Sequence, residues 1–511
     1  MVSRERSEEH IGDRQLVRGP VLPRDRYLNE ATQHSSLPSQ VCSINRDSAG
    51  INHTVSRTFR ELRELSLVNR VNLKFPLWRK LGYAVGGLGT DLASTAISFY
   101  LIFYLITVAN IPPVTAGLLV GVPKIILIPL DPLVGVLSDR VRSRFGQRRL
   151  FLLVCGPLSG LLFCMQFYMS IDLSTQALIV YWWIIQFAYT ANFSLLMVSY
   201  NAMEAELSSS SAERMQLVSM RQGLGILGSL AGSALTLVVV SLLGGGRMGF
   251  TGMGMLFGAL ISSSFLMVFA TTKPETPTRG DSPSFRQEAS ITLSLKPFRI
   301  QLGVIFLITL ATVVTNAIVV FYADYVHDLA DLLPLFMLVS SATALASIFG
   351  WNWLAKRWDR RRVFAIGLLI QAAVLLGLRF VPYRNMELLW PLVALTGVSS
   401  ASSIFPRAML TDVIAYDRSR QGRSRAGNIV GIWSLGNRAG QAIGNALAGW
   451  LLAFAGYHAE AVVTPQLQEG LRMILGYVPS AFCLAIIPLL MLFPLSRAEM
   501  KRIEESNRQQ T

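Results

Sequence analysis

The chain of 511 residues has few of the side chains on which most enzyme chemistry depends. It contains five histidines and four cysteines, and no histidine or metal-ligand cluster falls within an apolar run. The cysteines show neither metal spacing nor a disulfide pattern, and no GxxxxGKS or GxxxxGKT motif occurs. General acid–base, metal and ATP-driven chemistry therefore lack their usual residues, which argues against an intramembrane enzyme and predicts no cofactor.

The N-terminal region lacks a hydrophobic segment of the kind that signal peptides contain. Residues 1–75 are polar and rich in Arg, Ser and Asn, so we expect a disordered cytoplasmic tail without a cleavable leader. A shorter polar segment, 498–511, is expected to form a cytoplasmic C-terminal tail.

Charge is scarce between these two tails. Over the whole chain, tails included, only 15% of the residues are charged, and 52% are hydrophobic. Apolar runs of about 20 residues are long enough to cross a bilayer, and a helix satisfies the backbone of such a run within lipid. We therefore predict an all-α polytopic membrane protein with twelve transmembrane helices. The runs cover approximately 79–108, 113–138, 148–170, 174–205, 221–243, 249–271, 297–325, 329–354, 362–382, 387–415, 427–455 and 473–495.

The net charge of +15 is concentrated in alternate loops. Arg and Lys gather in 139–149, 355–362 and 417–425, whereas the loops on the opposite side have almost none. This asymmetry places the basic loops and both termini in the cytoplasm. We therefore expect a monomer embedded in the lipid bilayer of a bacterial inner or plasma membrane, and no binding of nucleic acid.

The sequence also divides into two similar halves. A polar, Pro-containing linker at 272–296 separates a predicted six-helix bundle at 76–271 from a second at 297–497. GVLSDRVRSRFGQRR follows the second run of the first half, and GWNWLAKRWDRRR follows the second run of the other half. Such a repeat is typical of transporters whose halves rock about a central site.

Asp91 and Asp131 lie within the first two apolar runs. An ionisable side chain deep in the bilayer costs roughly 3 kcal/mol on insertion scales, so it normally faces a cavity or a partner. Two such residues in neighbouring spans indicate a transporter of a polar solute or an ion.

Four sequence blocks resemble the glycoside–pentoside–hexuronide:cation symporters, the family that contains melibiose permease. They are KLGYAVGGLGTDLA, DPLVGVLSDRVRSRFGQRR, MEAELSSSSAERMQLVSMRQG and AMLTDVIAYDRSRQGRSRAGNIVGIWSLGNRAGQAIGNALAGWLLAFAGY, and the resemblance covers roughly residues 75–497. It implies a 6+6 major facilitator bundle and secondary active symport of a sugar, glycoside or related polar solute by alternating access. Because relatives of the family move lysophospholipids, an amphiphile is the alternative substrate.

The resemblance also assigns a substrate site. Asp91 matches an aspartate that contacts sugar hydroxyls, although it would alternatively satisfy helix ends within the glycine-rich GGLGTD stretch. Arg438 stands where the family usually has a cavity-facing lysine, and its fork of donors suits a carboxylate or phosphate, or Asp131. Gln441, Tyr200 and Asn201 complete the expected site, although interhelical hydrogen bonding would also explain such polar residues.

A coupling site follows from the same resemblance. Asp131 matches a carboxylate that binds the coupling cation, and Lys124, about two turns earlier, lies on nearly the same helix face. The alternative is an internal salt bridge that holds the helix in place. Leu127 and Met197 stand where the family has further carboxylates, so two of the oxygen ligands that sodium needs are replaced. We therefore expect a proton rather than sodium as the coupling ion.

A third set of charges lies at the cytoplasmic ends of the predicted spans. In the family such residues close the inner mouth in the outward-facing state. The alternative is a group of solvated loop charges, whose pairs are worth at most about 1 kcal/mol each. The set comprises Arg214, Asp412, Glu206, Arg423, Asp139 and Arg140.

Overall fold

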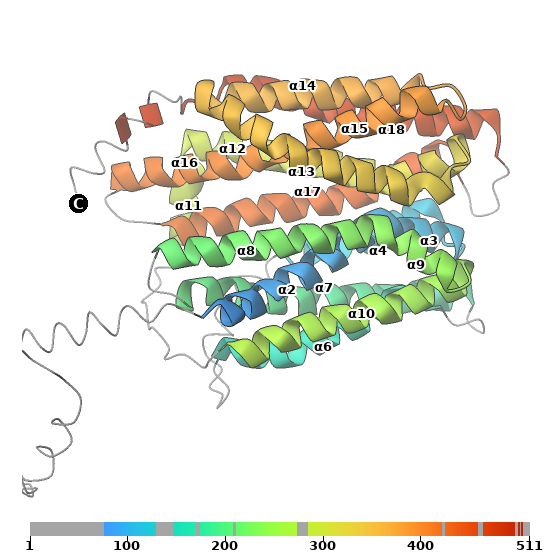
Figure 1. Ribbon diagram of the computed structural model, residues 1–511, viewed down its shortest axis with the longest axis horizontal. Coiled ribbons are helices and arrows are strands. Elements are labelled where there is room, and N and C mark those ends of the chain that lie inside the picture. Colours follow the sequence, from blue (N-terminus) through green and yellow to red (C-terminus); the bar gives the residue numbers. More distant parts are fainter. Residues whose placement is uncertain are drawn as a thin grey trace, which may run out of the picture. The chain divides into compact units, whose positions relative to one another are not determined.

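The computed structural model describes residues 76–128, 147–169, 174–207, 211–272, 285–421, 425–457, 463–495, 499–500 and 502–503. They belong to one compact unit, Phe75–Thr511. Within these ranges the regular structure is entirely helical, and the helices run alongside one another (Figure 1). The first half contains α2 (Leu77–Ala96), η1 (Ile97–Leu101), α3 (Ile102–Thr107), α4 (Pro113–Ile126), α6 (Gln147–Gln166), α7 (Thr175–Glu206), α8 (Ser211–Leu230), η2 (Ala231–Leu235), α9 (Thr236–Leu242) and α10 (Gly246–Thr271).

The second half repeats this all-helical composition. It contains α11 (Phe285–Ser294), α12 (Lys296–Phe321), η3 (Tyr322–Val326), η4 (Ala330–Leu332), α13 (Leu333–Arg357), α14 (Arg360–Arg379), α15 (Met386–Ser400), η5 (Ala401–Ser403), α16 (Ile404–Gln421), α17 (Ala426–Phe454) and α18 (Pro465–Met491).

In the described part of the chain, these helices overlap the predicted spans, of which the second is described only as far as residue 128. Ten helical segments of the described chain are long and apolar enough to cross a membrane. The helix α4 is shorter, with 14 residues. The helix α17 has 29 residues but is not among the ten, and it carries Asn437, Arg438, Gln441 and Asn445 along its length. The predicted all-α polytopic fold is confirmed.

Local sequence explains where several of these helices begin. Proline occupies the first position of α4 and α18, where its missing N–H leaves no helical hydrogen bond unmade. The side chain of Thr464 accepts a hydrogen bond from the Leu467 N–H at 3.2 Å, and Asn385 caps α15 in the same way.

The two halves repeat the same helix contacts. In the first half α2 packs on α8 and α10, while α6 packs on α7 and α10; in the second half α12 packs on α17 and α18, while α14 packs on α15 and α18. Arg149 at the start of α6 donates to the Phe269 carbonyl at 2.7 Å. Arg361 at the start of α14 donates to the Phe493 carbonyl at 2.8 Å. Equivalent basic motifs therefore hold equivalent helix ends.

The linker between the halves differs from the flexible segment expected at 272–296. It contains the helix α11, which packs against α12 and α17. Its sequence explains this difference, because Arg, Gln, Glu and Ala at 286–289 are good helix formers and follow the Pro-rich stretch.

Contacts between the halves involve α4 with α17, and α13 with η2. Backbones touch at the first of these interfaces: a Cβ atom at Gly117 would lie 2.9 Å from Gly449 Cα. Nearby, Asn316 of α12 donates to Ser98 Oγ of η1 at 3.2 Å. These residues occupy the halves of their helices that lie away from the basic loops.

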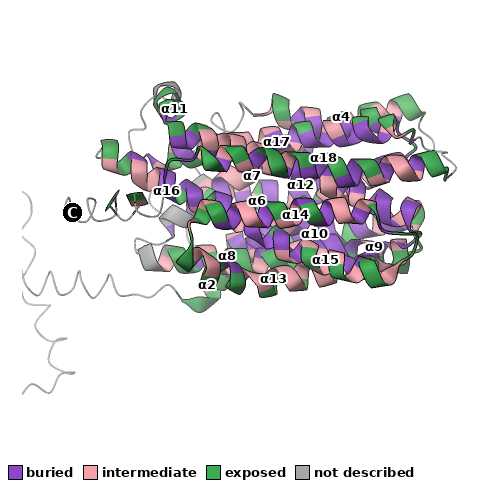
Figure 2. Cartoon of the chain, turned by 90° about the horizontal axis from the view of Figure 1, so that it is seen from above, coloured by how far each residue is buried: buried purple, intermediate pink, exposed green. Residues whose placement is uncertain are grey.

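Large apolar side chains remain exposed along the helices. Figure 2 shows exposed residues over the length of the helices around a buried interior. Examples on four different helices are Met248, Phe349, Phe454 and Met491. Lipid is the solvent that tolerates such a surface, and with the apolar spans it identifies an integral membrane protein.

His327 joins three segments at the end of the second half that lies away from the basic loops. The ring is 1% exposed, and its Nδ1 accepts a hydrogen bond from the Arg384 N–H at 3.2 Å. The ring proton therefore lies on Nε2, which donates to Tyr322 Oη at 2.9 Å. The Tyr322 hydroxyl in turn donates to the Leu378 carbonyl at 2.6 Å. Burial and the positive charge of Arg472 lower the pKa of His327 to about 4.

This pKa predicts a pH-dependent stability. His327 in the unfolded chain takes up a proton near pH 6.5 but resists it in the folded chain until about pH 4. The contribution of neutral His327 to the free energy of unfolding is complete above pH 6.5 and is lost as the pH falls towards 4. This contribution is on the order of 1–3 kcal/mol. The apparent unfolding temperature should therefore fall less steeply across this window in His327→Gln than in the wild type. Asp328→Asn, an exposed neighbour, should keep the wild-type slope; equal slopes in all three proteins would contradict the assignment.

Candidate functional site

Asp91 lies on α2 where that helix contacts α8 most closely. A Cβ atom at Gly225 of α8 would lie 2.1 Å from Asp91 Oδ2, so the carboxylate occupies space that only glycine leaves. One turn earlier on α2, a Cβ at Gly87 would lie 2.4 Å from the Arg221 carbonyl oxygen. Asp91 is half-buried, and its position follows from direct contact between two helix backbones.

Two arginines that sequence reasoning did not select act on Asp91. The positive charges of Arg221 on α8 and Arg407 on α16 both reach its carboxylate. They come from opposite halves of the chain, so Asp91 lies where the halves face each other. Each is an arginine within a predicted apolar run, and that is the signal that would have identified both.

The side chain of Tyr200 is enclosed by other residues of the first half. It is fully buried, its hydroxyl donates to the Tyr83 carbonyl at 2.7 Å, and the Tyr83 hydroxyl donates back to the Tyr200 carbonyl at 3.2 Å. The guanidinium of Arg221 lies 4.5 Å from the centre of its ring. Tyr200 therefore lies between Tyr83 of α2 and Arg221 of α8. Asn201, the next residue, is exposed.

Lys124 and Arg438 meet at the contact between the two halves. Helices α4 and α17 run in opposite directions, and a Cβ at Gly121 would lie 2.4 Å from the Ala442 carbonyl. Lys124 lies on α4 and Arg438 lies on α17, each about one turn from this contact in the direction of the basic loops. They are close enough for their charges to repel. The register of a backbone contact therefore brings two cations from different halves together.

Neighbouring side chains fix this part of α17. The Asn437 amide oxygen accepts a hydrogen bond from the Thr309 hydroxyl of α12 at 2.7 Å. Gln441 is half-buried, and its backbone carbonyl accepts from Asn445 Nδ2 at 2.7 Å. Gly436, Gly440 and Gly444 let α17 approach α12 closely, because a Cβ at each would lie 3.0 Å or less from an atom of α12.

The charges predicted to form the gate are only partly described. Asp412 on α16 forms an ion pair with Arg360 at the start of α14, within the same half. A second ion pair, Arg425 with Asp417, is buried beside it. The predicted gate residues Asp139, Arg140 and Arg423, and the side chains of Glu206 and Arg214, lie outside the described part. The same is true of the predicted coupling residue Asp131.

Among the residues that the structure describes, no group of three or more His, Cys, Asp or Glu is placed to hold a metal ion. Two of the uncharged positions of the predicted coupling site are described: Leu127 is half-buried at the end of α4, and the Met197 sulfur lies 3.7 Å from the Thr90 hydroxyl.

Comparison with known sequences identifies similar proteins. The model of the MFS/sugar transport protein family matches residues 82–497. The Escherichia coli protein YagG, whose name assigns it provisionally to the glycoside/cation symporters, is 28% identical over 433 residues, which cover 83% of this chain and 93% of YagG. The isoprimeverose transporter of Lactiplantibacillus pentosus is 23% identical over 84% of this chain and 91% of its own. A glucuronide carrier protein homologue of Escherichia coli is 22% identical, covering 83% and 94%.

Solved structures share the fold. A bacterial homologue of the human lysosomal transporter Spinster, in an inward-facing and occupied conformation, has a TM-score of 0.61 at 14% identity, covering 82% of this chain and 95% of its own. A D-xylose–proton symporter has a TM-score of 0.59 at 15% identity, covering 80% and 96%.

The contact between Asp91 and Gly225 can be tested with a single methyl group. Gly225→Ala should displace the Asp91 carboxylate and reduce solute uptake by about tenfold or more, because the added carbon has no space. Gly223→Ala is a matched control on the same helix, since nothing lies within 4 Å of its Cβ position. Uptake into vesicles and the amount of inserted protein would be measured together. Equal uptake by the two variants would show that the position of Asp91 is unimportant.

Proposed function

The chain belongs to the family of MFS/sugar transport proteins, the glycoside–pentoside–hexuronide:cation symporters, and we propose that it transports an acidic sugar or glycoside together with a proton. Membership makes it a symporter of the major facilitator type and not an enzyme. The nature of the solute, the identity of the coupling ion and the cytoplasmic location of both termini are the proposed parts.

The balance of charge at the site supports an acidic solute. We assign two groups of charges to it: Lys124 with Arg438, and Arg221 and Arg407 with Asp91, which is its described carboxylate. If Asp131 also faces this site, four cations still meet two carboxylates. An excess of positive charge in a site of low dielectric attracts anions. A carboxylate on the solute would complete the balance, and Arg438 offers the two parallel donors that such a group binds best.

Asp91 has a different role in this proposal. A carboxylate accepts several O–H donors, which suits the hydroxyl groups of a sugar ring. The proposed site therefore combines Asp91 for hydroxyls with Arg438 and Gln441 for the acidic group, and the positive charges of Arg221 and Arg407 attract the Asp91 carboxylate. The names of the relatives agree with a sugar-like solute, one of them neutral and one acidic.

The contacts between the halves support alternating access. The halves meet through Gly117, Gly449, Ser98 and Asn316, on the side away from the basic loops. In the proposed orientation this is the outer side, so the chain is closed towards the outside. Asp412 then pairs with Arg360 of its own half, and in the outward-facing state we propose that it turns to Arg214 instead.

Coupling to protons follows from the replaced carboxylates. Leu127 and Met197 supply no oxygen ligand, and one remaining carboxylate does not replace the water shell that sodium sheds. A single carboxylate does bind one proton. An amphiphilic solute is the second candidate, because Met197 places an apolar group beside Thr90, next to Asp91.

If the solute is acidic, Arg438 should determine the preference for an acid, and Asp91 should bind the sugar hydroxyls. In a thermal-shift assay, glucuronides should stabilise the purified protein more than neutral glycosides or lysophospholipids. Arg438→Gln should remove this preference, with a loss of about tenfold or more in affinity for the acid. Asp91→Asn should weaken the binding of acidic and neutral sugars alike, while the protein still inserts into the membrane. The exposed Arg420→Gln is the control; an unchanged preference in Arg438→Gln would overturn the role of Arg438.

Proton coupling predicts a response to pH and none to sodium. Uptake into vesicles should follow an imposed pH gradient and should be unaffected when choline replaces sodium at constant ionic strength. Asp131→Asn should abolish accumulation but spare exchange, because exchange needs no net movement of protons. Saturable stimulation by sodium without a response to pH would contradict this coupling.

A further inference from the structure

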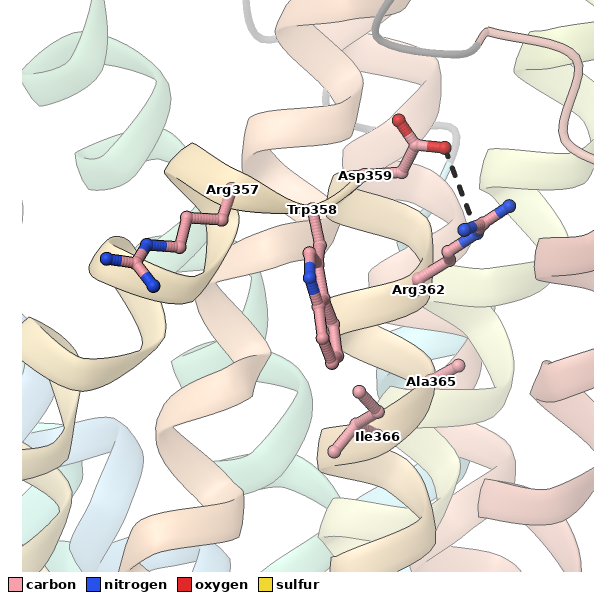
Figure 3. Close-up of a pocket in the computed structure, with 6 residues that line it drawn as sticks. All are labelled: Arg357, Trp358, Asp359, Arg362, Ala365 and Ile366. Carbon is pink, nitrogen blue, oxygen red and sulfur yellow. Dashed lines mark ion pairs between the residues drawn. The ribbon is translucent and has the colours of Figure 1, made fainter.

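A pocket of about 440 Å³ lies where α13 ends and α14 begins, away from the central site. Its lining combines charged and apolar side chains (Figure 3). The lining residues are Arg357, Trp358, Asp359, Arg362, Ala365 and Ile366.

The turn above this pocket carries five cations within seven residues, 356–362. Two of them are engaged within the protein: Arg360 pairs with Asp412, and Arg361 donates to the Phe493 carbonyl at 2.8 Å. Their positions fix the turn against α16 and against the end of α18. The arginines that line the pocket are different ones.

Arg357 and Arg362 are held only loosely by the protein. The guanidinium of Arg357 lies 4.0 Å from the centre of the Trp353 ring. Arg362 reaches Asp359 through Nε at 4.0 Å, and its side chain is 74% exposed. In Figure 3 the two arginines lie on opposite sides of the Trp358 indole. Both can therefore turn their remaining N–H donors towards a ligand that covers this ring.

The other wall of the pocket is apolar and continues along the membrane-facing surface. Ala365 and Ile366 lie on α14 one to two turns below the charged rim. Trp353 and Phe349, on α13, are exposed large aromatic residues. Exposed tryptophan next to clustered arginine is typical of the level at which lipid headgroups meet the hydrocarbon layer.

We propose that this pocket binds the headgroup of an acidic phospholipid from the leaflet on the side of the basic loops. The lipid phosphate accepts hydrogen bonds from Arg357 and Arg362, and the glycerol and the first carbons of the acyl chains lie on Trp358, Ala365 and Ile366. Asp359 offsets part of the positive charge, so a small free anion gains less here than a lipid, which also covers the apolar wall.

Short-chain phosphatidylglycerol added to the purified full-length protein in neutral detergent is the probe for this site. It should raise the apparent unfolding temperature, whereas phosphatidylcholine and inorganic phosphate should raise it much less. The double variant Arg357→Ala/Arg362→Ala should lose about tenfold in affinity for phosphatidylglycerol. The double variant Arg418→Ala/Arg420→Ala, which removes the same charge from exposed positions near the end of α16, should retain it.

Retention of phosphatidylglycerol in native mass spectrometry gives a second measurement that does not depend on unfolding. The pocket variant should keep less of this lipid than the wild type and the control variant. If phosphatidylglycerol raised the apparent unfolding temperature equally in both double variants, and if both retained it equally, the pocket would not be the lipid site. If inorganic phosphate raised the apparent unfolding temperature as much as phosphatidylglycerol does, the ligand of the pocket would be a free anion and not a lipid. If phosphatidylcholine raised it equally, the pocket would not require an acidic headgroup. Each outcome is independent of the transported solute.

Discussion

Direct contact between helix backbones is the constraint on which the rest of this structure depends. Lipid chains are as apolar as leucine, so the hydrophobic effect does little to press one membrane helix against another. Close packing of small residues replaces it: α4 meets α17 at Gly117, Gly121 and Gly449, and α2 meets α8 at Gly87 and Gly225. A single Cβ atom at any of these positions would lie 2.9 Å or less from a neighbouring atom. The helices therefore have little freedom to slide or rotate.

This fixed register decides where the charges lie. At the α2–α8 contact, the space left by Gly225 holds the Asp91 carboxylate. At the α4–α17 contact, one turn beyond Gly121 and Ala442, the register brings Lys124 beside Arg438 despite their repulsion. Neither arrangement is favourable on its own, since a confined carboxylate and two adjacent cations both raise the free energy. The packing of the surrounding glycines holds them in place.

The sequence predicted the parts of this architecture that depend on single segments. Apolar runs located the helices, the cost of a buried charge singled out Asp91, and the family resemblance pointed to Arg438. The sequence did not reveal Arg221 and Arg407 as neighbours of Asp91, because that requires the relative rotation of α2, α8 and α16. For the same reason the sequence did not reveal that Tyr200 on α7 is buried against Tyr83. The helix α11 was missed because prolines nearby obscured a short stretch of good helix formers.

The surplus of cations offers a physical route to the proposed coupling. An empty carrier that moves between two faces of a membrane must keep its central charges balanced in both states, because unbalanced charge is costly in low dielectric. If Asp131 faces Lys124 and Arg438, as the proposed coupling requires, its ionised carboxylate is their counter-ion within the protein. A proton on Asp131 removes that counter-ion, and the carboxylate of an acidic solute can then take its place. Proton and solute would thus be favourable together and unfavourable apart, which is the thermodynamic requirement for symport.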